Sequence, residues 1–258
     1  MDILYFLIAF GATTVGALTG MGGGVIIKPL CDIIGPYDAQ TIGVLACVTV
    51  FSMALVSLGR QFRQKACFAL ETSVPLSAGA VLGGSIGQRI LERAASHWPD
   101  AQVVIAQNVT LSLVIGLVFW YMLHKNELPS LHLRGLVPAV LAGVLLGASS
   151  SFLGIGGGPV NVALMIFLFS FDTKTATVCS ILTILFAQVS KMATLLLGGG
   201  LGRYDFSVLP CMVLGAVLGG LLGARLNKRL SEKTVEHAFN AVQMLVLTLC
   251  LVNIVHNL

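Results

Sequence analysis

The sequence predicts an all-α membrane protein of two inverted repeats, each with a glycine-broken re-entrant segment and three transmembrane helices. Three observations predict this fold: an apolar composition, a duplicated sequence pattern and a one-sided distribution of basic residues. Of the 258 residues, 56% are apolar and only 10% are charged, against about 25% charged in a typical soluble domain. The mean hydropathy of +0.93 also indicates an integral membrane protein. The net charge of +4 is too small to indicate a nucleic-acid partner.

Six uninterrupted apolar stretches approach the roughly 20 residues that a helix needs to cross the hydrocarbon core. They cover residues 41–58, 72–90, 103–123, 175–197, 206–226 and 238–255. Two further apolar regions, 3–34 and 136–171, are interrupted near the middle by glycines. The first lacks the basic region and cleavage site of a signal peptide, so we expect it to be retained as a membrane segment. The six cysteines have no CxxC spacing, and we expect them to be small buried side chains.

An internal repeat relates the two halves of the chain. Residues 20–24, Gly-Met-Gly-Gly-Gly, match residues 154–158, Gly-Ile-Gly-Gly-Gly, at an offset of 134. Residues 80–89 match residues 216–225 at an offset of 136, and seven of these ten pairs are identical. Two blocks in the same order indicate a duplication. We therefore divide the chain into a first repeat (1–123), a cytoplasmic linker (124–134) and a second repeat (135–258).

The basic residues favour inverted copies. If each glycine-broken region enters and leaves on the same side, the chain has six crossings and two re-entrant segments; otherwise it has eight crossings and parallel copies. In the inverted arrangement one side holds Arg60, Arg63, Lys65, Lys125, Arg134, Lys174, Arg225, Lys228, Arg229 and Lys233, and the other holds Arg89, Arg93 and Arg203. The parallel arrangement divides the same residues almost equally. Because basic residues concentrate in cytoplasmic loops, both chain ends are expected outside the cytoplasm.

The two glycine breaks are the candidate substrate site. Non-helical backbone at membrane depth persists only inside the protein or beside a water-filled cavity. The half-helices that follow, 25–34 and 159–169, begin with free N–H groups and a positive dipole end, which attract anions. Pro159 is typical of a helix start. Discontinuous helices in inverted repeats hold the substrate in many secondary transporters. The predicted anion-binding glycines are Gly22, Gly23, Gly24, Gly156, Gly157 and Gly158.

Polar residues near the breaks are further candidates. Lys28 lies in the first turns of the first half-helix, where its ammonium group could bind an anion or extend to the membrane surface. Lys191 is close enough to its helix end that we expect it to reach the surface. Six polar residues that flank the breaks could hydrogen-bond an oxyanion, or only satisfy broken backbone. They are Thr13, Thr14, Ser149, Ser150, Ser151 and Asn161. No carboxylate or histidine is expected at mid-membrane, so the coupling ion, proton or sodium, stays open.

Two other sets of residues have structural interpretations. The glycines spaced by four, at 79, 83 and 87 and at 215, 219 and 223, are typical of close helix packing. Asp38 and Asp172 each precede a predicted helix, where aspartate is a good N-cap. We expect neither set to bind substrate.

The duplicated glycine pattern resembles the TauE/SafE family of sulfite and organosulfonate exporters. The resemblance rests on residues 20–24, on Val-Ile-Ile-Lys-Pro-Leu at 25–30 and on the second copy at 154–164, and it covers essentially the whole chain. It implies a multi-pass protein of the bacterial inner membrane that exports small sulfur-containing oxyanions. Two positions depart from the family pattern: Ala163 stands where the first copy has Pro29, and Lys28 replaces a residue that is more often apolar.

The leading hypothesis is a secondary transporter whose repeats move around an anion bound between the breaks. An anion-selective channel and an importer of another small anion are the alternatives. An enzyme is not expected, because no nucleophile with its base, facing acid pair or metal cluster is apparent, and no cofactor or metal is expected. The expected partners are the anionic substrate and the lipid bilayer, with a homodimer left open.

Overall fold

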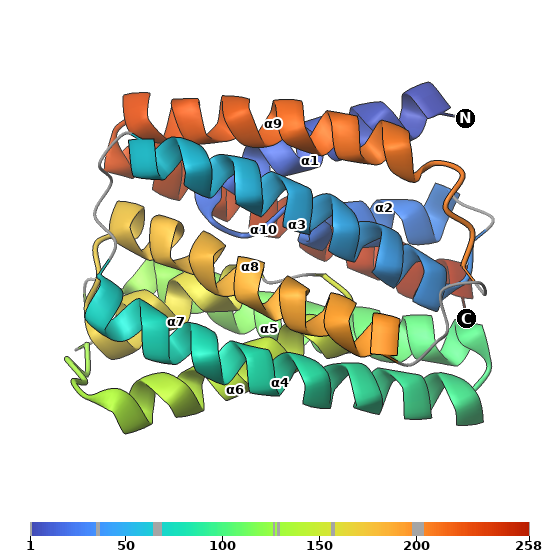
Figure 1. Cartoon of the computed structure of the whole chain (residues 1–258), viewed down its shortest axis with the longest axis horizontal. Coiled ribbons are helices and arrows are strands. Elements are labelled where there is room, and N and C mark those ends of the chain that lie inside the picture. Colours follow the sequence, from blue (N-terminus) through green and yellow to red (C-terminus); the bar gives the residue numbers. More distant parts are fainter. Residues whose placement is uncertain are drawn as a thin grey trace.

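The computed structural model describes residues 2–34, 37–63, 69–125, 127, 130–155, 158–197 and 204–257. Within them the chain forms ten α-helices that lie side by side as one bundle (Figure 1). They are α1 (Asp2–Thr19), α2 (Gly24–Ile34), α3 (Ala39–Arg63), α4 (Leu70–His97), α5 (Asp100–His124), α6 (Leu136–Phe152), α7 (Pro159–Phe169), α8 (Thr173–Leu197), α9 (Leu209–Arg229) and α10 (Glu232–Asn257).

The predicted apolar stretches coincide with long helices. Each of the six uninterrupted stretches corresponds to one of α3, α4, α5, α8, α9 and α10. Among the described residues, α1, α3, α5, α8, α9 and α10 are long and apolar enough to span a membrane. The chain is therefore a multi-pass membrane protein. The helices α6 and α7 are apolar but shorter.

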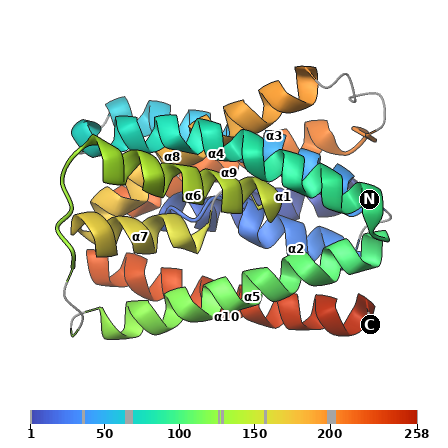
Figure 2. The ribbon, with the colours of Figure 1, turned by 90° about the horizontal axis from the view of Figure 1, so that it is seen from below.

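The two glycine-interrupted regions fold as helical hairpins. The ring centroids of Tyr5, near the start of α1, and Tyr37, after the end of α2, lie 6.0 Å apart. The amides of Leu131 and Leu133, just before α6, donate to the carbonyls of Phe167 and Leu168 at the end of α7. In both pairs, α1 with α2 and α6 with α7, the chain therefore returns to the end of the molecule from which it entered. Figures 1 and 2 show α1 and α2 entering from the right and α6 and α7 from the left.

The helix packing is the same when the two halves are exchanged. Helix α1 packs on α9 as α6 packs on α4, and α3 packs on α9 as α8 packs on α4. Glycines allow the closest approaches, since a Cβ atom on any of them would overlap backbone of the facing helix. The contacts are Gly79, Gly83 and Gly87 with Val140, Val144 and Ala148, and Gly215, Gly219 and Gly223 with Phe6, Phe10 and Thr14. The packing role predicted for these glycines is confirmed.

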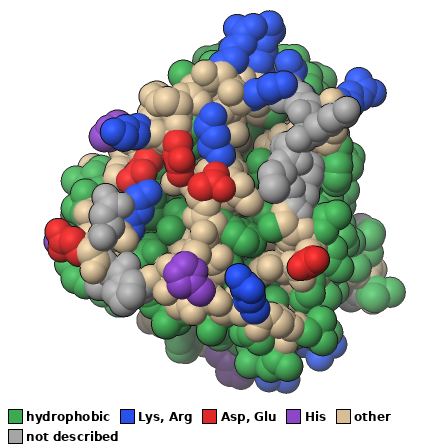
Figure 3. Space-filling view, turned by 90° about the vertical axis from the view of Figure 1, so that its left-hand side faces the viewer, with side chains coloured by type: hydrophobic (Ala, Val, Ile, Leu, Met, Phe, Trp, Pro, Cys, Tyr) green, Lys and Arg blue, Asp and Glu red, His purple; other side chains and the backbone are tan. Residues whose placement is uncertain are grey.

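Basic side chains gather at one end of the bundle. Figure 1 shows the ends of α3, α5 and α9 and the starts of α8 and α10 at its left, and Figure 3 shows Lys, Arg, Asp and Glu side chains on that face. The last turns of α3 and α9 there contain Arg60, Arg63, Lys228 and Arg229. Two predicted members of the charge count, Lys65 and Arg203, lie outside the described residues.

The N-cap prediction is confirmed for both aspartates. The carboxylate of Asp38 accepts from the amide of Thr41 at 3.4 Å, and that of Asp172 accepts from the amide of Thr175 at 3.0 Å. The cysteines are also placed as expected: Cys31, Cys47, Cys179 and Cys250 are buried, and Cys211 is half-buried. Cys67 lies outside the described residues.

Candidate functional site

The two breaks meet inside the bundle. Gly20 and Gly154, equivalent positions of the two repeats, have φ angles of +79° and +67°, a backbone region that glycine adopts without steric cost. A Cβ atom on Gly24 would overlap the carbonyl of Ile155. The start of α2 is therefore in contact with the segment that follows α6. Gly156 and Gly157, two of the predicted site glycines, lie outside the described residues.

Both half-helices start at the breaks, as predicted. The carbonyl of Gly23 accepts from the amides of Ile26 and Ile27, and that of Gly158 accepts from the amide of Asn161. Helix α7 has Pro159 in its first turn. The first amides of each helix have no partner within their own helix, and each start carries partial positive charge. Two such helix starts at the centre of a bundle form an environment suited to an anion.

Lys28 is fully buried on α2 and forms an ion pair there. The lysine is 2% exposed, so it does not extend to the surface. Its Nζ lies 3.1 Å from Oδ2 and 3.2 Å from Oδ1 of Asp32, one helical turn further along, and the Asp32 side chain is only 1% exposed. Asp32, a carboxylate that the sequence analysis did not single out, is therefore buried beside an ammonium group that balances its charge.

Lys191 is also buried, and the prediction that it reaches the surface is wrong. It is 2% exposed, and its Nζ donates to the carbonyl of Gly43 on α3 at 3.1 Å. The side chain extends across the α3–α8 interface instead of along α8, since Gly43 leaves room for its end. A Cβ atom on Gly43 would lie 3.6 Å from this nitrogen.

The two lysines converge on the second break. A Cβ atom on Gly154 would lie 3.2 and 3.3 Å from Cδ and Cε of Lys28 and 3.6 Å from Cα of Gly43, the residue that receives Lys191. Between them the lysines have one carboxylate partner in the described residues, Asp32. With both amines protonated the region is positively charged and unbalanced, which favours an anion and disfavours a cation.

Comparison with known families gives one match. The model of the family described as "Sulfite exporter TauE/SafE" matches residues 5–250. The chain belongs to the TauE/SafE family. Its members are membrane transporters and not enzymes, so the predicted class of protein is confirmed. No curated protein and no solved structure matches the chain.

The other predicted site residues of this TauE/SafE protein differ in their burial and in their hydrogen-bond partners. Asn161 is 3% exposed in the first turn of α7, and its side chain makes no hydrogen bond with the described residues. Ser150 is 5% exposed near the end of α6. Thr14 faces α9, and its hydroxyl donates to the carbonyl of Phe10 on its own helix. Thr13, and not Thr14, is the threonine that lies against Gly23.

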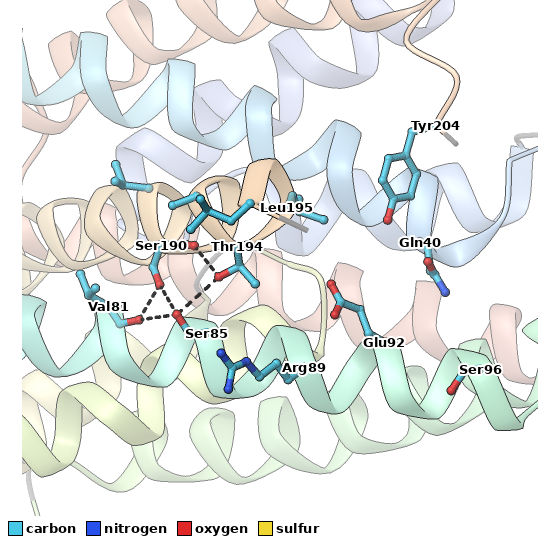
Figure 4. A pocket seen from close by; sticks show the side chains of 13 residues that line it. Gln40, Val81, Ser85, Arg89, Glu92, Ser96, Ser190, Thr194, Leu195 and Tyr204 are labelled. Carbon is cyan, nitrogen blue, oxygen red and sulfur yellow. Dashed lines mark hydrogen bonds between the residues drawn. The ribbon is translucent and has the colours of Figure 1, made fainter. Parts of the chain in front are cut away.

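A cavity of about 890 Å³ opens between α4 and α8 in the TauE/SafE fold. Figure 4 shows its inner part, where the hydroxyls of Ser85, Ser190 and Thr194 point toward one another. The two serine oxygens are 3.0 Å apart, and Thr194 donates to Ser85 at 3.4 Å. Toward the mouth, the lining includes Arg89 and Glu92 of α4 and Gln40 of α3. The cavity thus contains hydroxyl donors and one guanidinium group, all of which can bind an oxyanion.

A second cavity of about 530 Å³ lies at equivalent positions of the other half. It is lined by Val56, Gly59, Arg60 and Arg63 of α3 and by Leu221 of α9. At the repeat offsets, Val56 corresponds to Ser190, Arg60 to Thr194 and Leu221 to Ser85. The two cavities therefore lie toward opposite ends of the bundle and differ in chemistry, since Arg60 takes the place of Thr194 and apolar residues take the places of the two serines.

Proposed function

We propose that this protein exports small sulfur-containing oxyanions, sulfite or organosulfonates, across the bacterial inner membrane by alternating access. The observation that carries the proposal is the presence of two buried lysines near the helix breaks, of which only Lys28 forms an ion pair with a described carboxylate. The sulfur chemistry of the substrate comes from the family. The bound anion would accept hydrogen bonds from the amides at 22–24 and 156–158 and from the side chain of Asn161, and Lys28 would donate a charge-assisted hydrogen bond to it.

Inverted repeats are part of the proposal. The hairpins enter from opposite ends of the bundle (Figure 1), and α3 (39–63) and α8 (173–197) have bounds that differ by 134 at both ends. The matched packing of α1 on α9 and of α6 on α4 is what a two-fold axis in the membrane plane produces. The concentration of basic residues supports a cytoplasmic location for the ends of α3 and α9.

The equivalent cavities support alternating access. Each cavity is lined by helices of both repeats and lies toward one end of the bundle, so a movement that exchanges the conformations of the repeats would open one cavity and close the other. The cytoplasmic cavity contains Arg60 and Arg63, which favour capture of an anion. The lining of the outer cavity contains the carboxylate of Glu92 as well as Arg89, and this negative charge weakens anion binding and favours release.

An anion channel is the second candidate, and a flux experiment separates the two. Purified protein in liposomes is tested with sulfite, sulfate, thiosulfate, sulfoacetate and taurine, with and without a proton gradient. Saturable flux of sulfite or a sulfonate, faster than that of sulfate, supports the transporter. Flux that increases linearly with concentration and ignores gradients of other ions supports the channel, and flux equal to that of empty liposomes contradicts both.

A further inference from the structure

Lys191 lies in the bundle interior, and none of the described residues forms an ion pair with it. Ion pairs among the described residues are Lys28–Asp32 and Lys125–Glu236, and Lys191 belongs to neither. Among the described residues, its one hydrogen-bond partner is the neutral carbonyl of Gly43. A single carbonyl does not balance the charge of a buried ammonium group.

The ionisable groups facing Lys191 from neighbouring helices do not neutralise it either. They are Cys47 of α3, Lys28 of α2 and Glu92 of α4. The Cys47 thiol donates to the carbonyl of Gln188, and Lys28 repels a second ammonium group. Glu92 is exposed in the outer cavity, where it accepts a hydrogen bond from Gln88 at 2.9 Å. The resting site therefore favours a neutral amine, which can still donate to Gly43.

An incoming anion reverses this balance. An isolated buried charge costs several kcal/mol, whereas an ammonium group against an oxyanion forms a strong charge-assisted hydrogen bond. Binding of the anion without the proton would bury an unpaired negative charge, and protonation of the amine without the anion would bury an unpaired positive charge. Each therefore binds more favourably in the presence of the other, which is thermodynamic coupling between the two.

We propose that Lys191 completes the substrate site and that its amine takes up one proton as the anion binds. The proton comes from hydronium or a buffer acid in the water that reaches the site, so the bond between the proton and that donor breaks as the N–H bond to Lys191 forms, and the resulting ammonium group forms an ion pair with the anion. On release to the far side, the anion and the proton leave together, so the protein moves protons in the same direction as its substrate. The inference rests on the proposed function, because it concerns the same bound anion.

The placement of Lys191 gives this proton a route outward. Gly43, its partner, lies one helical turn from Gln40 on α3, and Gln40 lines the outer cavity. Ser190 and Thr194, on the helix that carries Lys191, line the same cavity. Anion and proton could therefore leave the site by one water-accessible path.

Calorimetric titration of the purified wild-type protein with sulfite tests the inference. The titration is done above the second ionisation of sulfurous acid, in two buffers of different ionisation enthalpy, which gives the protons bound per anion. We expect about one proton per anion in the wild type. Lys191→Met should weaken sulfite binding at least ~10-fold and reduce proton uptake to about zero.

Two further variants sharpen the result. A guanidinium group stays protonated, so Lys191→Arg should bind sulfite without proton uptake. Lys233→Met, the same replacement at an exposed position of α10, should behave as the wild type. Wild-type binding without proton uptake, or unchanged affinity and uptake in Lys191→Met, would overturn the inference. Binding that depends on Lys28 but not on Lys191 overturns this inference alone, whereas no sulfite or sulfonate binding by the wild type overturns the proposed function.

Discussion

Lys28 and Lys191 are each 2% exposed, yet their surroundings give them different roles at the scale of single residues. Lys28 has Asp32 within 3.1 Å and is a neutral pair with it. The amine of Lys191 donates to the carbonyl of Gly43 and has no carboxylate partner among the described residues, so a bound anion would stabilise its protonated form. The sequence could have predicted the first environment, because Asp32 follows Lys28 by four residues on one half-helix. It could not have predicted the second, since Gly43 is distant in sequence.

Removing one partner of the buried pair should be costly. Lys28→Met leaves the Asp32 carboxylate buried without a partner, so we expect a loss of about 3–5 kcal/mol in stability. The double variant Lys28→Met/Asp32→Leu removes both charges and should recover most of that stability while still binding sulfite more weakly than the wild type. Thermal unfolding in detergent and sulfite titration measure the two effects. A double variant as unstable as the single one would contradict this view of the pair.

Gly154 should not tolerate a side chain. Its φ angle of +67° and its contact with the Lys28 side chain predict that Gly154→Ala costs about 1–2 kcal/mol or more. Gly116→Ala is the matched control, because a Cβ there on α5 would meet nothing within 4 Å. Alanine in a helix is favoured over glycine, so the control should be neutral or slightly stabilising. The melting temperatures of the two variants test this prediction. Equal melting temperatures would show that the backbone at Gly154 tolerates a side chain.

At the scale of helices, the sequence predicted more of the fold than of the site. The half-helices were expected at 25–34 and 159–169 and are found at Gly24–Ile34 and Pro159–Phe169, because glycine runs and Pro159 fix helix starts locally. The contact between the start of α2 and the segment after α6 is, in contrast, a contact between the two repeats. Such contacts leave no periodic signal in the sequence, so the convergence of Lys28 and Lys191 could not be predicted.

The two equivalent helix pairs should respond alike to the same change. A leucine at Gly83 would overlap the backbone of Val144, and one at Gly219 would overlap Phe10. Each variant should lose about 1–3 kcal/mol or more, because packed backbones cannot separate without opening the interface. Gly11→Leu, at an exposed position of α1 with nothing within 4 Å, is the control. The stability of the three variants is compared by size-exclusion chromatography after heating. A Gly83→Leu variant that withstands heating as well as Gly11→Leu would argue against close α4–α6 packing.

At the scale of the whole molecule, the account depends on opposite entry of the two hairpins. The bundle brings both chain ends to one side and the ends of α3 and α9 to the other (Figure 1). Charge counting predicted this arrangement, because it sums over every loop and does not depend on any one contact. The cavities at equivalent positions follow from the same arrangement, and their unequal arginine content is compatible with outward transport.

Labelling from each side of the membrane tests the topology. Ser231→Cys and Ser96→Cys place a thiol at exposed serines at opposite ends of the bundle, in a background with Cys67 and Cys211 replaced by alanine. An impermeant maleimide added outside intact cells should label position 96, and position 231 only after the cells are opened. Labelling of both positions in intact cells would contradict the inverted arrangement.

The most direct test of the central claim is the position of a bound anion. Selenite is a heavier analogue of sulfite, and its selenium gives an anomalous diffraction signal in crystals of the protein. The account predicts one peak between the starts of α2 and α7, close to the amines of Lys28 and Lys191. A peak confined to the arginines of the surface cavities, or no peak at saturating selenite, would contradict an anion site at the helix breaks.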